Sequence, residues 1–214
     1  MRTKKVVIID YGIGNVKSMC NAFYNIGVEP ILTADKQTIL NANALVLPGV
    51  GAFQKGMANL HSAGLVETIH EYVKKGNPFL GVCLGMQMLM QESEEFGITP
   101  GLGLIKGKVV RLPLAVSLDE KLPHVSWNEL HEPSPGRWKN TILHDLPQKT
   151  DVYFVHSFVV VPEKLEDLLT TTNYGGVDFC SSIHHENIYG TQFHPEKSSE
   201  KGQVILNNFI NLIK

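Results

Sequence analysis

A cysteine flanked by glycines is the most reactive feature of the sequence. In the stretch NPFLGVCLGMQML, residues 77–89, strand-like apolar residues give way to helical spacing at Cys83. Gly81 and Gly85 permit a tight turn that a Cβ would obstruct, so the thiol would project from the C-terminal edge of a sheet, as in a nucleophile elbow. The N–H of Leu84 would stabilise an oxyanion, and the dipole of the following helix would favour the thiolate. The alternative is a cysteine that only fills the core, a common role for a free thiol.

Two further stretches are placed to contact a substrate held at this thiol. Gln87 follows Cys83 by one helical turn, and helical side chains lean towards the N-terminus, so its amide would reach the same side. The stretch LVLPGVGAF, residues 45–53, ends another predicted strand in a glycine-rich loop. A backbone N–H of Val50 or Gly51 would supply a second oxyanion donor. Without the cysteine, the same loop would be an ordinary strand-to-helix turn.

A base for the thiol must come from elsewhere, and TQFHPEKS, residues 191–198, is the best candidate. His194 and Glu196 are separated by one residue, so in extended backbone they project to the same side. The carboxylate would then hold the second imidazole nitrogen and stabilise the imidazolium. Pro195 limits the backbone between them. Alone, this motif would also suit a solvated turn; with Cys83 it completes a nucleophile, a base and an orienting group.

The predicted elements place these motifs at one sheet edge. In the first half, short apolar runs alternate with helical stretches, including one helical stretch from PGVGAF to YVKKGNP, which predicts a mostly parallel sheet flanked by helices. Ligand sites in such sheets lie beyond the carboxyl ends of the strands. The second half is β-rich and turn-separated, which predicts additional antiparallel strands, and residues 199–213 form a last amphipathic helix. The stretch 117–149 is the least regular. The length favours a single domain over residues 1–214.

Composition excludes several classes of function. Of the 214 residues, 43% are hydrophobic and 19% charged, and the formal net charge of −2 suggests neither a nucleic-acid partner nor a strongly charged surface.

The apolar run near the N-terminus is interrupted by Asp10 and is too short for a signal segment or a membrane span, so a cytoplasmic protein is expected. Cys20, Cys83 and Cys180 are widely spaced and expected to be reduced, with Cys20 and Cys180 packing in the core.

Six motifs in order along the chain strongly resemble the class I (triad-type) glutamine amidotransferases: DYGIGN, LPGVGAF, GVCLGMQ, PHVSWNE, YFVHSF and FHPEKS. The resemblance implies a flavodoxin-like α/β fold and needs no metal or organic cofactor. It implies that Cys83 attacks the side-chain amide of L-glutamine, forming a glutamyl thioester that water hydrolyses to glutamate. By the family pattern, the triad is Cys83, His194 and Glu196. Gln87 contacts glutamine, and Val50 or Gly51 with Leu84 forms the oxyanion hole.

Within this family, the motifs look like those of HisH-type glutaminase subunits of imidazole glycerol phosphate synthase. That resemblance implies a heterodimer with a HisF-like (β/α)8 cyclase subunit, which receives the ammonia through a channel and makes imidazole glycerol phosphate and AICAR in histidine biosynthesis. The matching positions near such a partner are Asn15, Trp127, Tyr153 and Lys197.

One motif departs from the family pattern. The usual H-M-G-W-N is here HVSWN, residues 124–128, with Ser126 in place of glycine. The added Cβ puts the local geometry near the partner face in question. HisH-like paralogues that supply ammonia for the amidation of a surface-polysaccharide sugar are therefore an alternative, as are other α/β hydrolases with a cysteine elbow and a non-catalytic module of the same fold. Gly12 and Gly14 lack the third glycine of a dinucleotide site, and His184 and His185 would point to opposite faces of a strand rather than share a metal.

Overall fold

The computed structural model describes residues 4–113 and 121–213 and contains a large mixed sheet. At its centre, five parallel strands lie in the order β2-β1-β3-β4-β13. With β13 in the fifth position, this is the flavodoxin-like strand order, and the predicted fold class is confirmed. The bounds of these strands are β1 Val6–Ile9, β2 Ile31–Thr33, β3 Ala44–Gly49, β4 Phe79–Cys83 and β13 Ile188–Thr191.

The predicted antiparallel strands extend the sheet beyond β13. β12, β10 and β7 continue it in antiparallel pairs, β5 joins β7 in parallel, and β6 and β11 pair with β5 and β12. β8 and β9 form a separate two-stranded sheet. Their bounds are β5 Glu92–Ser93, β6 Thr99–Pro100, β7 Gly107–Arg111, β8 His124–Leu130, β9 Thr150–His156, β10 Phe158–Pro162, β11 Leu168–Tyr174 and β12 Val177–His185.

Two sequence predictions about local structure were wrong in part. The stretch 117–149 lies partly outside the described residues, but it contains the seven-residue strand β8, whose pairing with β9 is not encoded locally. The single helical stretch predicted between β3 and β4 is two helices, α3 and α4, because the chain turns at Gly64 with a φ of +62°. A side chain would disfavour that backbone conformation.

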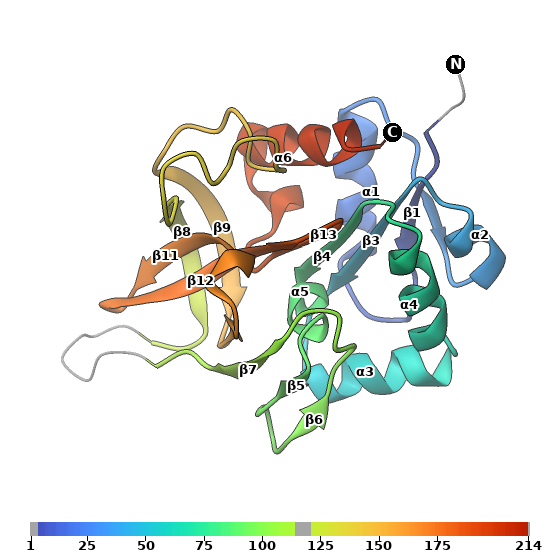
Figure 1. Cartoon of the computed structure of the whole chain (residues 1–214), viewed down its shortest axis with the longest axis horizontal. Helices are drawn as coiled ribbons and strands as arrows, with labels where there is room; N and C mark the ends of the chain where they lie inside the picture. The colour runs from blue at the N-terminus through green and yellow to red at the C-terminus, as the bar shows by residue number, and fades with distance from the viewer. Residues whose placement is uncertain (1–3, 114–120, 214) are drawn as a thin grey trace.

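Helices cover both faces of the parallel strands (Figure 1). α1 and α6 pack on one face, and α2, α3, α4 and α5 pack on the other, so the sheet separates two hydrophobic clusters. The helices are α1 Val16–Asn25, α2 Lys36–Leu40, α3 Phe53–Ser62, α4 Val66–Lys74, α5 Leu84–Met88 and α6 Ser199–Asn211, with 3-10 turns η1 Leu165–Asp167 and η2 Pro195–Lys197.

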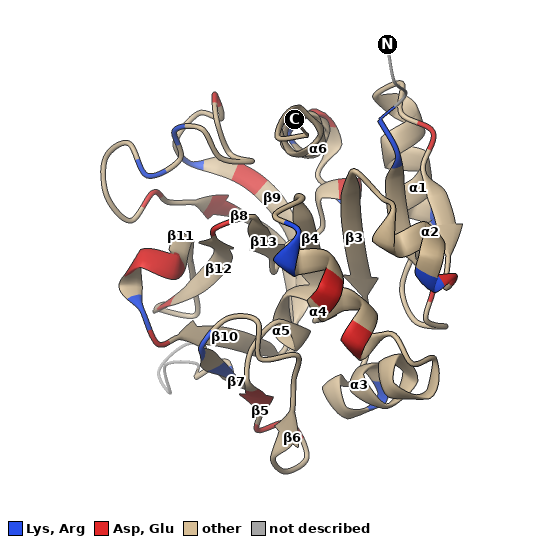
Figure 2. Ribbon diagram, turned by 45° about the vertical axis from the view of Figure 1, so that its right-hand side comes forward, with Lys and Arg blue, Asp and Glu red and all other residues tan. Residues whose placement is uncertain are grey.

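Four of the five parallel strands, β1, β3, β4 and β13, are buried on both faces, which explains their continuous apolar sequences, whereas the edge strand β2 is largely exposed. In β1, Val6 and Ile8 belong to one hydrophobic cluster while Val7 and Ile9 belong to the other. Burying each such side chain contributes about 1.5–3 kcal/mol. Figure 2 shows no charged residue on β3, β4 or β13; Lys, Arg, Asp and Glu lie mainly on the helices, outer strands and loops.

The two cysteines predicted to pack in the core do so. Cys180 is buried, and the partly buried Cys20 packs against the cluster formed with α1 and α6; both are free thiols, as is Cys83. None of the helices in residues 4–113 and 121–213 combines the length and apolarity of a bilayer-crossing segment.

Candidate active site

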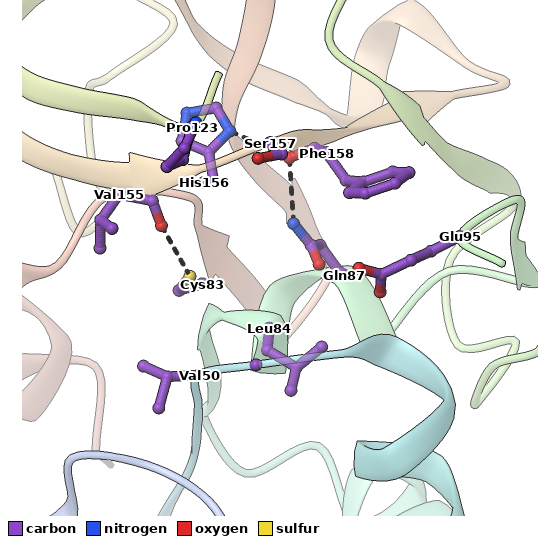
Figure 3. A pocket seen from close by; sticks show the side chains of 11 residues that line it. Val50, Cys83, Leu84, Gln87, Glu95, Pro123, Val155, His156, Ser157 and Phe158 are labelled. Atoms are coloured by element: carbon purple, nitrogen blue, oxygen red, sulfur yellow. Dashed lines mark hydrogen bonds between the residues drawn. The ribbon is translucent and has the colours of Figure 1, made fainter. Parts of the chain in front are cut away.

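The carboxyl ends of three central strands bring the predicted site residues to one sheet edge. Gly49 at the end of β3 pairs with Cys83 at the end of β4, and β13 pairs with β4 on its other side. A cavity of about 300 Å³ opens at this edge. Its walls, shown in Figure 3, are formed by Val50, Gly51, Cys83, Leu84, Gln87, Glu95, Pro123, Val155, His156, Ser157 and Phe158.

Cys83 adopts a backbone conformation that L-residues rarely occupy. Its φ is 54° and its ψ −111° at the junction between β4 and α5, the turn predicted from the flanking glycines. A Cβ at Gly85 would lie 1.8 Å from the carbonyl oxygen of Leu47, and one at Gly81 would lie 2.7 Å from the carbonyl oxygen of Gly85. Both positions therefore require glycine. A conformation of this kind costs about 1–3 kcal/mol and persists only where the surrounding structure enforces it.

The helix that follows Cys83 is short. α5 has only five residues, because the chain turns away after Met88 towards β5. A helix dipole grows with the number of aligned peptide units, so α5 contributes less to stabilising a thiolate than a full helix would. The N–H of Leu84, the first residue of α5, still follows Cys83 directly in the chain.

His194 and Glu196 form a buried pair. Nδ1 of His194 lies 2.7 Å from Oε1 of Glu196, and each side chain is 2% exposed. The predicted extended backbone holds at His194 but not at Glu196, because Pro195 starts a 3-10 turn that nevertheless brings the carboxylate to the imidazole. Ser198 fixes this turn: its hydroxyl donates to the carbonyl of His194 and accepts from the N–H of Tyr153.

The charge environment of His194 favours its protonated form. Burial alone would lower the pKa of His194, but interactions with Cys83 and Glu196 outweigh burial and raise it to about 10. Within the described part of the chain, Nε2 of His194 has no hydrogen-bond partner that meets standard geometry, and neither does Oε2 of Glu196. The imidazole is therefore held through Nδ1 while Nε2 remains available for proton transfer with the neighbouring thiol.

Gln87 lies on the cavity wall, but its amide nitrogen is already engaged. Nε2 of Gln87 donates to the carbonyl of Phe158 and to Oε1 of Gln192, both at 3.0 Å (Figure 3 shows the first). The side chain is thus held in one orientation, and its Oε1 is the atom left to contact a substrate. The residues predicted for the oxyanion hole, Val50, Gly51 and Leu84, also line the cavity.

Sequence reasoning missed Glu95 and the β9–β10 connection. Oε2 of Glu95 accepts a 2.6 Å hydrogen bond from the N–H of Phe53, which holds the carboxylate beside Gln87 at the cavity (Figure 3). His156, Ser157 and Phe158, from the connection between β9 and β10, also line the cavity. The only sequence signal for Glu95 was its place among several acidic residues, and nothing local distinguishes it from solvated carboxylates.

The four residues predicted near a partner lie around η2. The exposed indole of Trp127 packs edge-on against Tyr153, with ring centroids 6.0 Å apart, and Nζ of Lys197 lies 5.4 Å from the Tyr153 ring. Tyr153 also lies beside His194, with ring centroids 6.4 Å apart. Asn15 immediately precedes α1, which packs against η2. The structure thus connects this surface to the buried His194.

Ser126 fits into β8 without distorting it. It pairs with Phe154 of β9 and has no positive φ, so this position does not require the glycine of the family pattern. Its hydroxyl lies 2.9 Å from Nε2 of His124 and donates to Asn128. The serine therefore adds polar contacts within the strand.

Comparison with known proteins decides the family. Residues 7–212 match the family model described as glutamine amidotransferase class-I. The chain belongs to the class I glutamine amidotransferase family. This glutamine amidotransferase is 44% identical over 211 residues to imidazole glycerol phosphate synthase subunit HisH 1 of Legionella pneumophila (strain Lens), with 97% of this chain and 99% of that relative covered. It is also 44% identical to subunit HisH of Moorella thermoacetica, covering 99% of this chain and 96% of the relative.

Solved structures agree with the fold of this glutamine amidotransferase. The structure of PurLQS from Thermotoga maritima matches with a TM-score of 0.73 at 18% identity, covering 99% of this chain and 100% of that one. A glutamine amidotransferase from the same organism matches with a TM-score of 0.64 at 16% identity, covering 99% of this chain and 84% of that one. At these identities the likeness establishes the fold alone.

Proposed function

We propose that this amidotransferase hydrolyses L-glutamine to glutamate and ammonia with Cys83 as nucleophile, His194 as base and Glu196 as orienting carboxylate. The observation that carries the proposal is the strained turn at Cys83, which faces the cavity beside a buried His194–Glu196 pair. A residue is held in such a conformation at a cost, and a reactive thiol at a cavity is a reason for it.

The reaction divides into two steps of acyl transfer. The Cys83 proton moves to Nε2 of His194, the sulfur attacks the amide carbon, and the negative charge on the carbonyl oxygen is stabilised by backbone N–H groups of Leu84 and of Val50 or Gly51. The tetrahedral intermediate collapses as His194 returns the proton to the leaving nitrogen, so ammonia departs and a thioester remains. Water, deprotonated by His194, then releases glutamate and restores the thiol.

The cavity also offers groups that would hold the amino-acid end of glutamine. The Glu95 carboxylate is fixed by the Phe53 N–H and lies beside the Gln87 amide, so it is placed to bind an ammonium group. A charge-assisted hydrogen bond of this kind contributes about 1.5–3 kcal/mol. Gln87 would accept from the substrate through Oε1, because both hydrogens of its Nε2 are already donated.

We further propose that the chain is the HisH-type subunit of an imidazole glycerol phosphate synthase and passes its ammonia to a HisF-like (β/α)8 partner that makes imidazole glycerol phosphate and AICAR. Relatives 44% identical over nearly the full length carry the HisH name. The exposed Trp127, with Tyr153 and Lys197, offers an aromatic and cationic surface around the turn that holds His194. Contact there would reach the catalytic imidazole through Tyr153.

The decisive experiment measures glutamate release from L-glutamine with and without a HisF-type partner protein and its nucleotide ligand. We expect slow release from the chain alone and faster release from the complex. Cys83→Ala and His194→Ala should abolish release in both settings while thermal unfolding shows a folded protein. Activity retained in Cys83→Ala would remove this thiol from the mechanism. Failure of the HisF-type protein to bind or stimulate would instead favour another acceptor, such as the sugar-amidation route.

A further inference from the structure

Gln192 contacts the Cys83 sulfur, an interaction that none of the roles described so far uses. It follows β13 directly, its side chain is fully buried, and it lies between the nucleophile and the substrate-facing glutamine. Its Nε2 donates to Sγ of Cys83 at 3.6 Å, a normal distance for a hydrogen bond to sulfur. Its Oε1 accepts from Nε2 of Gln87 at 3.0 Å. A buried side chain that touches the reacting atom is a candidate for the chemistry rather than for packing alone.

The direction of this amide is fixed by a chain of hydrogen bonds that starts at a backbone group. The carbonyl of Phe158 can only accept, so the amide atom of Gln87 that lies 3.0 Å from it must be the NH2 group. The second hydrogen of that group points to Gln192, which must therefore present its oxygen to Gln87 and its NH2 to the sulfur. Nδ1 of His156, also 3.0 Å from the Phe158 carbonyl, donates to the same oxygen and helps hold it in place.

The imidazole of His194 supports a thiolate, but the backbone carbonyl that contacts the sulfur within the described residues does not. Sγ lies 3.9 Å from the carbonyl oxygen of Val155, which can accept the S–H proton but repels a negative sulfur. The short helix α5 gives limited dipole support. When the proton leaves for His194, Gln192 is the neutral side chain already aimed at the sulfur.

We propose that Gln192 is a further catalytic residue, whose amide stabilises the Cys83 thiolate by hydrogen bonding while its oxygen positions Gln87 for the substrate. A donated hydrogen bond stabilises the ionised sulfur more than the thiol and so increases the fraction of reactive nucleophile at neutral pH. Because the amide is neutral, it supports the thiolate without competing with His194 for the proton.

The test is the pH dependence of Cys83 alkylation by iodoacetamide in the full-length chain. Mass spectrometry of the Cys83 peptide separates this thiol from Cys20, which is also partly accessible. Gln192→Met keeps the length of the side chain but removes the donor. We expect the midpoint of its alkylation profile to move up by about one pH unit, so that the alkylation rate falls about tenfold at pH values below both midpoints. Gln87→Met should move the midpoint in the same direction by less, because it frees the Gln192 amide to rotate.

Thr191→Val is the matched control. Thr191 is adjacent to Gln192, fully buried, and its hydroxyl has no partner within the described residues, so its replacement should leave the alkylation profile unchanged. A midpoint in Gln192→Met equal to that of the wild type would overturn the proposal, even if activity were lost through altered packing. If Gln192→Met does not fold, Gln87→Met decides in the same way. The catalytic role of Gln192 rests on the proposed glutaminase function. The alkylation assay requires no glutamine, so it tests the contact between Gln192 and the thiolate even if the proposed glutaminase function is wrong.

Discussion

The backbone strain at Cys83 can be measured by comparing the stabilities of an alanine and a glycine variant at this position. Both Cys83→Ala and Cys83→Gly lack the sulfur, so they differ only in the Cβ, which at φ 54° and ψ −111° conflicts with the backbone. In an ordinary buried strand, exchanging alanine for glycine destabilises a protein. At residue 83 the exchange also relieves strain, so its cost should be smaller or reversed.

The magnitude follows from comparison with Ala44, a fully buried residue of β3 with no positive φ. Ala44→Gly should lower the free energy of unfolding by about 1.5 kcal/mol, from about 0.5–1 kcal/mol of backbone entropy and about 0.8 kcal/mol for one buried methyl group. At residue 83 the same terms are opposed by about 1–3 kcal/mol of strain. The two exchanges should therefore differ by about 1–3 kcal/mol.

Urea denaturation of the wild type, Ala44→Gly, Cys83→Ala and Cys83→Gly measures this difference, provided that the slopes with denaturant are equal. The free energy of Cys83→Ala minus that of Cys83→Gly is compared with the cost of Ala44→Gly. If the exchange costs as much at residue 83 as at residue 44, the turn stores no strain, and the argument that a nucleophile is held there at a cost is wrong.

Three other substitutions test the construction of the site. Gly85→Ala places a Cβ 1.8 Å from the Leu47 carbonyl oxygen, so we expect a lower melting temperature and loss of glutamate release; wild-type values would contradict the close approach of α5 to β3. Burial, followed by the nearby His124, lowers the pKa of His156 to about 3, below its value of about 6.5 in an unfolded chain. As the pH falls, the unfolded state therefore binds a proton at this histidine before the folded state does. The free energy of unfolding is unaffected by this histidine above about pH 6.5 and falls by up to about 1.4 kcal/mol per pH unit between there and pH 3. His156→Asn should give a shallower decline in urea denaturation between pH 7 and 4, and an unchanged slope would refute this origin. Ser126→Ala removes a hydroxyl that contacts His124 and should lower the free energy of unfolding by about 0.5–1.5 kcal/mol, a loss that a calorimetric scan would detect.

Sequence reasoning located the residues whose requirements are local. Gly81 and Gly85 mark the sharp turn because a Cβ at either position meets backbone, and this restriction is visible in a short motif. The spacing of His194 and Glu196 likewise predicted their contact, although a 3-10 turn at Pro195 makes it rather than the expected extended backbone. The mostly parallel character of the first half of the sheet followed from apolar runs alternating with helical ones. In each case the physical cause lies within a short stretch of the chain.

The residues that sequence reasoning missed depend on distant pairing. Gln192 reaches Cys83 only because β13 inserts beside β4, more than a hundred residues later in the chain. Glu95 reaches the cavity through the N–H of Phe53 on another element. β8 was not recognised because its regular pairing partner, β9, begins twenty residues after it ends. Nothing in the composition of these segments distinguishes their members from surface polar residues.

The incomplete hydrogen bonding of the proposed catalytic groups has one physical explanation. Cys83 is strained, Nε2 of His194 lacks a partner within the described residues, and Glu196 keeps one buried oxygen unpaired there. Each arrangement lowers stability, because a buried polar atom without a hydrogen bond costs about 1–3 kcal/mol. Yet Ser198, Tyr153 and the close packing of Gly202 against Pro195 hold the same segment firmly. A proton-transfer site requires a rigid surrounding structure and polar atoms that have no partner in the free protein. Hydrogen bonds to those atoms within the fold would stabilise the free protein and leave no atoms to bind the transition state.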